Sequence, residues 1–82
     1  MFDYDKLRGK IKEVYRTQKK FAKSLGIGTV SLSQRLNNQL EFTSSEISKS
    51  CDLLNVPLEE IPVYFFRAKV QKDEPNEEPK TA

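Results

Sequence analysis

The sequence predicts an all-α fold, a compact domain of five short helices over residues 1–70 with a disordered acidic and polar tail over residues 71–82. Three observations lead to this prediction. Apolar residues recur at helical spacing in separate segments, and residue types that begin or end helices lie between those segments. The chain has 82 residues, enough for one small domain. Because so short a chain buries a limited core, we expect each helix end to be well specified locally.

The first helix is predicted to begin after Asp3 and to continue to about Tyr15. Its apolar residues follow i, i+4, i+7 and i+8 spacing, which defines one buried stripe of Leu7, Ile11, Val14 and Tyr15. Asp3 can cap the helix, and Phe2 with Leu7 has the spacing of a hydrophobic staple.

The second helix is predicted between Thr17, a good N-cap residue, and Gly26, which suits the position after a helix end. Phe21 and Leu25 lie one turn apart and are expected to be buried. Ala22 is small, so it allows another helix to approach closely.

The third helix is predicted to begin after Gly28 and to end near Asn37 or Asn38, since Asn tolerates the left-handed conformation. Leu32 and Leu36 are expected to face the core. The same spacing directs four side chains outward, namely Val30, Ser33, Gln34 and Asn37.

The fourth helix has the clearest start signal in the chain. Thr43 and Glu46 form a T-x-x-E capping box, and Phe42 with Ile47 has staple spacing. We expect this helix to continue to about Leu54 and to bury Ile47, Cys51 and Leu54.

The fifth helix is predicted to have Pro57 in its first turn, with Leu58 and Ile61 facing the core. Pro62 makes it short or bent, because proline lacks the backbone N–H that a regular helix needs. The aromatic residues of segment 63–70 either close the core or form a partly exposed patch for dimerisation. The β-branched and aromatic content of this segment also permits an extended conformation.

Several function classes are excluded by composition. The chain has one cysteine, Cys51, and no histidine, so we expect no disulfide, no metal site, no cofactor and no enzymatic activity. Cys51 is expected to be a buried apolar residue. No apolar segment approaches the length of a membrane span, and the first ten residues lack the layout of a signal peptide. We therefore expect a cytoplasmic protein.

Charge is distributed unevenly along the chain. Residues 6–35 carry nine basic side chains and one acidic side chain, whereas the remaining segments are net acidic. This asymmetry favours a surface that meets a polyanion such as DNA. A solvated lysine-rich surface without a partner is the alternative.

Residues 17–38 have the spacing of a helix-turn-helix, with Ala22, Gly26 and Leu32 at the positions that need a small residue, a turn and an anchor. The segment TQKKFAKSLGIGTVSLSQRLNNQLEFT, residues 17–43, resembles the lambda repressor/Cro group of temperate-phage regulators, the Xre family. The whole chain, with VSLSQRLNN and EEIPVYFF, also resembles short phage regulators encoded beside the repressor. Some of those act as modulators that bind the repressor. The resemblance implies a lambda-repressor-like DNA-binding domain in a bacterial host.

The resemblance also implies roles for individual residues. The positions that read DNA bases in the group correspond to Thr29, Val30, Ser33 and Gln34. Gln34 can form two hydrogen bonds to adenine, and Val30 can contact a thymine methyl group. The positions that contact the DNA backbone correspond to Gln18, Lys19, Arg35, Asn37, Asn38 and Gln39. For Arg35, a plain surface position is an equal alternative.

Two functions follow from these features. The first is a Cro-like, sequence-specific transcriptional regulator that inserts residues 29–37 into the major groove of an operator. It would bind as a homodimer, with half-sites about 10 bp apart. The second is an antirepressor that uses the same fold to bind the DNA-binding domain of a phage repressor. Gly28 and Val30 depart from the residues common in DNA readers, which weakens the case for strong recognition by one helix. The expected dimer or partner contacts are Leu58, Tyr64, Phe65 and Phe66.

Overall fold

The computed structural model describes residues 1–68 and confirms the predicted all-α, five-helix fold. The α-helices are α1 (Asp5–Tyr15), α2 (Gln18–Leu25), α3 (Thr29–Leu36), α4 (Ser44–Leu54) and α5 (Ile61–Phe65), and a short 3-10 helix, η1 (Leu58–Glu60), precedes α5. Within these residues the only strand-like pairing is an isolated antiparallel bridge between Phe2 and Ala68. The tail predicted over residues 71–82 lies outside the described residues.

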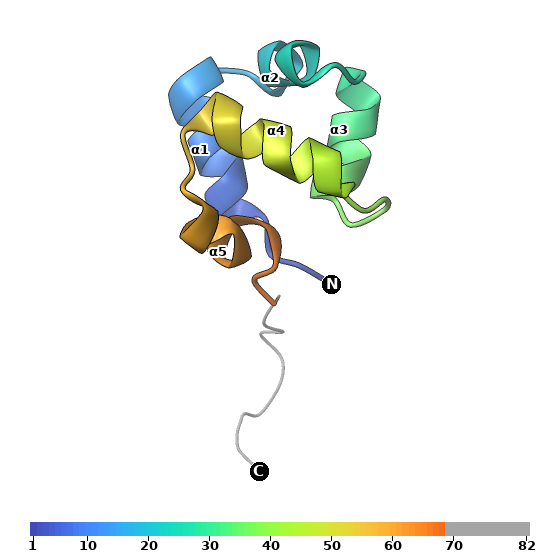
Figure 1. Cartoon of the computed structure of the whole chain (residues 1–82). Helices are drawn as coiled ribbons and strands as arrows, with labels where there is room; N and C mark the ends of the chain where they lie inside the picture. The colour runs from blue at the N-terminus through green and yellow to red at the C-terminus, as the bar shows by residue number, and fades with distance from the viewer. Residues whose placement is uncertain (69–82) are drawn as a thin grey trace.

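Helix α4 crosses the middle of the domain and packs against α1, α2 and α5 (Figure 1). α3 packs on α2 at a steep angle, at the opposite end of the domain from α5 (Figure 1). The first residues of the chain and the end of α5 lie on the same side (Figure 1). The side chains most deeply buried between these helices are Phe21, Phe65, Leu7, Ile11, Leu32, Leu36, Leu54 and Ser50.

The predicted helix ends of α2 and α4 are confirmed. The Thr17 hydroxyl accepts a hydrogen bond from the Lys20 N–H (3.1 Å), and Gly26 ends α2 with a φ of 90°. This φ lies in the left-handed region, which favours glycine. Thr43 and Glu46 form both hydrogen bonds of the capping box at the start of α4. α3 begins after Gly28, as expected, without a side-chain cap.

The buried stripe of α1 differs from the prediction at one end. Val14 is 42% exposed, whereas Tyr4, which precedes the helix, is buried. The stripe therefore extends toward the N-terminus, because Tyr4 packs on the Phe42 ring and the far end of the helix is covered by contact between Tyr15 and Phe21. The N-cap position is one residue later than predicted, at Tyr4, which makes no side-chain cap bond. The Asp3 carboxylate accepts a hydrogen bond from the N–H of Asp5, the first residue of α1 (2.9 Å).

The segment from Pro57 to Phe66 also differs from the prediction. Leu58, expected in the core, is 74% exposed, and Ile61 is half-buried. Two prolines five residues apart break the segment into η1 and α5, and this shifts the inward positions to Val56, Tyr64 and Phe65. Residues 63–65 are helical, so the extended alternative is wrong there. The prediction of a short or bent helix at Pro62 is confirmed.

Cys51 is buried in α4 as a free thiol, in agreement with the prediction. Burial raises the pKa of this thiol, and the negative charge of Asp52 raises it further. None of the helices within residues 1–68 is both long and apolar enough to cross a membrane. Those residues also contain no group of three or more side chains suited to hold a metal ion.

Candidate macromolecule-binding surface

Helices α2 and α3 form a rigid pair through the turn at Gly26. The N–H groups of Gly26 and Ile27 donate to the Ala22 carbonyl at 2.9 and 3.0 Å, which completes the end of α2. Ile27 packs against the core, and Leu32 and Leu36 are buried. One side of α3 is thus fixed on the core, which leaves its opposite side open to a partner.

The four residues expected to read DNA bases lie along the outer side of α3. Thr29 and Val30 are exposed, with Val30 at 72%, whereas Ser33 and Gln34 are half-buried. All four side chains are uncharged, and the most exposed large apolar group of the helix is Val30. The outer side of α3 is therefore a mildly polar surface with an aliphatic side chain at its N-terminal end.

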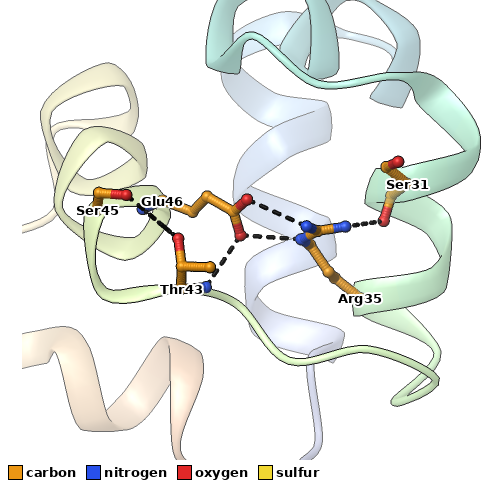
Figure 2. Close-up of polar contacts among 5 residues, drawn as sticks. All are labelled: Ser31, Arg35, Thr43, Ser45 and Glu46. Atoms are coloured by element: carbon orange, nitrogen blue, oxygen red, sulfur yellow. Dashed lines mark hydrogen bonds and ion pairs between the residues drawn. The ribbon is translucent and has the colours of Figure 1, made fainter.

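Arg35 does not face outward. Its guanidinium group makes two hydrogen bonds to the Glu46 carboxylate at 2.9 and 3.1 Å, and a third to the Ser31 carbonyl at 2.9 Å (Figure 2). The two charged side chains are only 14% and 15% exposed. Glu46 and the Ser31 carbonyl thus already bind the guanidinium, and the expected contact of Arg35 with a DNA phosphate, which would have to compete with them, stays a prediction.

Glu46 connects α3 to the N-terminal end of α4. Its carboxylate accepts from Arg35 on α3 and from the Thr43 N–H (3.0 Å) at the start of α4 (Figure 2). Burial alone would raise the pKa of this carboxyl, but the hydrogen bonds from Arg35 and Thr43 outweigh it and hold the pKa below its usual value. The ion pair and the capping box form one network that fixes α3 against α4.

Asn38 is also committed inside the protein. Its side-chain amide accepts from the Phe2 N–H and donates to the Phe2 carbonyl, both at 2.9 Å. The residue has a φ of 63°, the left-handed conformation expected near this helix end. These bonds tie the first residues of the chain to the end of α3, and the expected role of Asn38 on a phosphate stays a prediction.

Arg8 is a residue whose role the sequence did not reveal. Its guanidinium donates to the Leu36 carbonyl (2.9 Å) and to the Asn37 side-chain oxygen (2.8 Å). A cation at the C-terminal end of a helix is favourable there. Its partners lie 28 and 29 residues away, so no local spacing could have identified them. Asn37 remains exposed, and its amide also donates to the Ser33 hydroxyl (3.2 Å).

Seven of the nine basic residues in segment 6–35 lie on α1 and α2. Lys19 is exposed, and Gln18 is half-buried at the start of α2. Gln18 lines a cavity of about 250 Å³ together with Arg8, Ile11, Lys12 and Arg16. Some of the basic groups have partners within the chain, since Lys10 pairs with Glu13 (3.9 Å) and Lys6 lies over the Tyr64 ring (5.3 Å).

The loop after α3 brings residues of a different kind next to the helix. The N–H groups of Gln39 and Leu40 both donate to the Gln34 carbonyl, at 2.8 and 3.2 Å. Gln39 and Glu41 are exposed, and Leu40 is 47% exposed. The aliphatic side chain of Leu40 and the carboxylate of Glu41 therefore follow directly on Asn37, Asn38 and Gln39, which we expected to contact phosphate. No spacing or motif in the sequence had indicated that Leu40 and Glu41 form part of an exposed surface.

The residues expected at a dimer or partner contact separate into two pairs. Leu58 and Phe66 are 74% and 50% exposed, so both remain available. Tyr64 and Phe65 are buried, at 7% and 1% exposure, and belong to the core. The contact expected for Tyr64 and Phe65 is therefore wrong.

Comparisons with known proteins give a family and a similar solved structure. The chain matches the family described as "Protein of unknown function (DUF739)" over residues 1–68. Its fold is similar to the solution structure of the modulator of repression (MOR) of the temperate bacteriophage TP901-1 from Lactococcus lactis. The TM-score is 0.72 at 38% sequence identity, over 85% of this chain and 95% of that chain. No curated protein matches the chain. The chain belongs to the DUF739 family.

Proposed function

We propose that this protein is a phage regulator that binds the DNA-binding domain of a phage repressor and so modulates repression. One observation carries the proposal. The outer side of α3 and its following loop present Val30, Leu40 and Glu41, whereas Arg35 and Asn38 are committed inside the protein. The similarity to the modulator of repression of phage TP901-1 supports a role in modulating repression.

Physical chemistry favours a protein partner over DNA at this surface. DNA binding depends on cations that neutralise phosphates, and the Arg35 cation on α3 is already paired with Glu46. Glu41 lies in the loop expected to approach phosphate, where its negative charge would be repelled. Protein interfaces, in contrast, have cores with few charges and with apolar anchors, which suits Val30 and Leu40.

Sequence-specific DNA binding is the second candidate function. The observation that favours it is the set of exposed basic side chains on α1, on α2 and at the turn between them, namely Lys12, Arg16, Lys19, Lys20 and Lys23. Gln34 is half-buried on the outer side of α3 and would be the main base-reading residue. This function would need a homodimer, for which Leu58 and Phe66 are the remaining exposed candidates among the contacts we expected. In either function, we place the protein in the cytoplasm of the bacterial host, and we propose no enzymatic activity.

Isothermal titration calorimetry with the DNA-binding domain of the same phage's repressor tests the proposal. We expect a Kd of about 1 μM or tighter. Val30→Asp should weaken binding about tenfold or more, because it places a charge in the centre of the interface. Val14→Asp is the matched control, since Val14 is also exposed but lies on α1.

Fluorescence anisotropy with duplex DNA from the operator region separates the two candidates. The main proposal expects no specific binding to DNA by the protein alone. Absence of repressor binding, together with DNA binding that weakens steeply with salt, would overturn it in favour of the second candidate.

A further inference from the structure

A preformed apolar cleft lies beside the loop that follows α3. It consists of two adjoining cavities of about 280 and 190 Å³. Both are lined by Phe2, Tyr4 and Glu41. Met1 and Leu40 border the first cavity, and Phe66 borders the second. None of the residues on α3 that the proposed function uses lines either cavity.

The floor of the cleft is held rigidly. The Tyr4 ring meets the Phe42 ring edge-on with centroids 5.5 Å apart, and Phe42 meets Phe65 in the same way at 5.3 Å. Phe2 is fixed by its two hydrogen bonds to Asn38 and by an edge contact with Phe66 at 5.7 Å. A ligand group would therefore enter a site whose shape already exists, which lowers the entropic cost of binding.

The rim of the cleft exposes apolar side chains. Met1, Leu40 and Phe66 are 80%, 47% and 50% exposed, and they are three of the seven exposed large apolar residues within residues 1–68. This concentration of apolar surface at one cleft favours an apolar ligand group, because burial of that surface on binding is favourable.

Charge restricts the partner further. Among the described residues 1–68, Glu41 is the only charged group that lines either cavity, apart from the α-amino group of Met1. Burial raises the pKa of Tyr4, and the negative charge of Glu41 raises it further. Because residues 1–68 contribute no Lys or Arg side chain to the lining, this part of the chain offers the cleft no cation for a phosphate. A cation beside an apolar group is complementary to it.

The cleft is continuous with the surface assigned above to the repressor. Leu40 and Glu41 belong to the loop whose backbone is bonded to Gln34 on α3. We propose that the cleft receives one apolar side chain of the repressor's DNA-binding domain, with an adjacent Lys or Arg that pairs with Glu41. This inference rests on the proposed function. A DNA-binding domain carries Lys and Arg side chains for phosphate, so its surface supplies the required cation.

Two substitutions in the full chain test the cleft by calorimetry against the same repressor domain. Leu40→Asp should weaken binding about tenfold, because it removes an apolar rim and adds a charge. Glu41→Lys should also weaken binding about tenfold at low salt, and the loss should shrink as salt screens the charges.

Matched controls carry the same changes on exposed residues outside the cleft. Val14→Asp on α1 and Glu59→Lys on η1 should leave the Kd within about twofold of the wild type. Circular dichroism establishes that each variant is folded. Glu41→Lys keeps the test decisive if Leu40→Asp unfolds, because Glu41 is exposed. In addition, amide NMR signals of Phe2 and Leu40 should shift when the repressor domain is added.

The outcomes separate this inference from the proposed function. If Val30→Asp abolishes binding while Leu40→Asp and Glu41→Lys leave the Kd unchanged, the cleft and the loop after α3 are not part of the interface, and the proposed function stands on the outer side of α3 alone. If the wild-type chain does not bind the repressor domain, both are overturned. Loss of binding in the cleft variants, with unchanged controls, supports the cleft.

Discussion

Helices α3 and α4 differ in how their N-terminal ends are capped, although both belong to the same domain. α3 begins after Gly28, which has no side chain to cap the first N–H groups. α4 begins with a complete capping box, whose Glu46 also holds Arg35 of α3. The comparison teaches that the position of α3 depends on the start of α4, while the start of α3 itself is left open beside the exposed residues Thr29 and Val30.

Glu46→Ala should break this arrangement most severely. The change removes the cap bond to the Thr43 N–H and leaves the half-buried Arg35 without its carboxylate. We expect the free energy of unfolding to fall by about 2–3 kcal/mol, as measured by urea denaturation. Glu13→Ala is the control, since the Glu13 side chain is 71% exposed and its ion pair should contribute less than about 1 kcal/mol. Equal losses in the two variants would contradict the dependence of α3 on α4.

Acid should weaken the same network, and its effect distinguishes the contribution of the Glu46 charge from that of the Glu46 capping hydrogen bond. The pKa of Glu46 is lowered in the folded protein, so the carboxylate stabilises the fold above its unfolded pKa, about 4.3, and this stabilisation is lost as pH falls through the folded value. Glu46→Gln retains a capping group without the charge. The difference in unfolding free energy between wild type and Glu46→Gln should therefore be largest near neutral pH and should shrink below about pH 4. A difference that is independent of pH would exclude the charge as its cause.

Gly28→Ser should give α3 a side-chain cap like that of α4, and it should have the smallest effect on the free energy of unfolding. Gly28 has a φ of −73° and a ψ of 158°, which any residue adopts, and an added Cβ would meet no atom within 4 Å. A serine hydroxyl there can accept from the first turn of α3, so we expect a gain of a few tenths of a kcal/mol. A thermal unfolding curve measures it, and a lowered Tm would show that the start of α3 needs glycine.

Local signals explain why most of the fold could be predicted from the sequence. Thr17, Gly26 and the Thr43–Glu46 box each act within four residues or at one backbone position, so their effect is readable in a short segment. The buried positions Leu32 and Leu36 follow from helical spacing alone. The errors at Val14 and Leu58 arose where a neighbouring aromatic residue or a proline changed which side of the helix faces the core.

The candidate site was less predictable because long-range partners decide which polar groups are free. Glu46 lies 11 residues from Arg35, and Phe2 lies 36 residues from Asn38. Spacing on a single helix cannot show that the Arg35 and Asn38 side chains already have hydrogen-bond partners elsewhere in the fold. The cleft around Phe2 and Tyr4 likewise combines the first residues, the loop after α3 and the end of α5, which only the folded chain brings together.

The Arg35–Glu46 pair has a consequence for how such proteins diverge. Because either charge alone would be left half-buried without its partner, mutations at these two positions should be accepted together or not at all. Thr29 and Val30, whose exposed side chains lie outside that pair, can change one at a time without loss of the fold. Related proteins can thus retain the packing of α3 against α4 while the exposed residues at the start of α3 change.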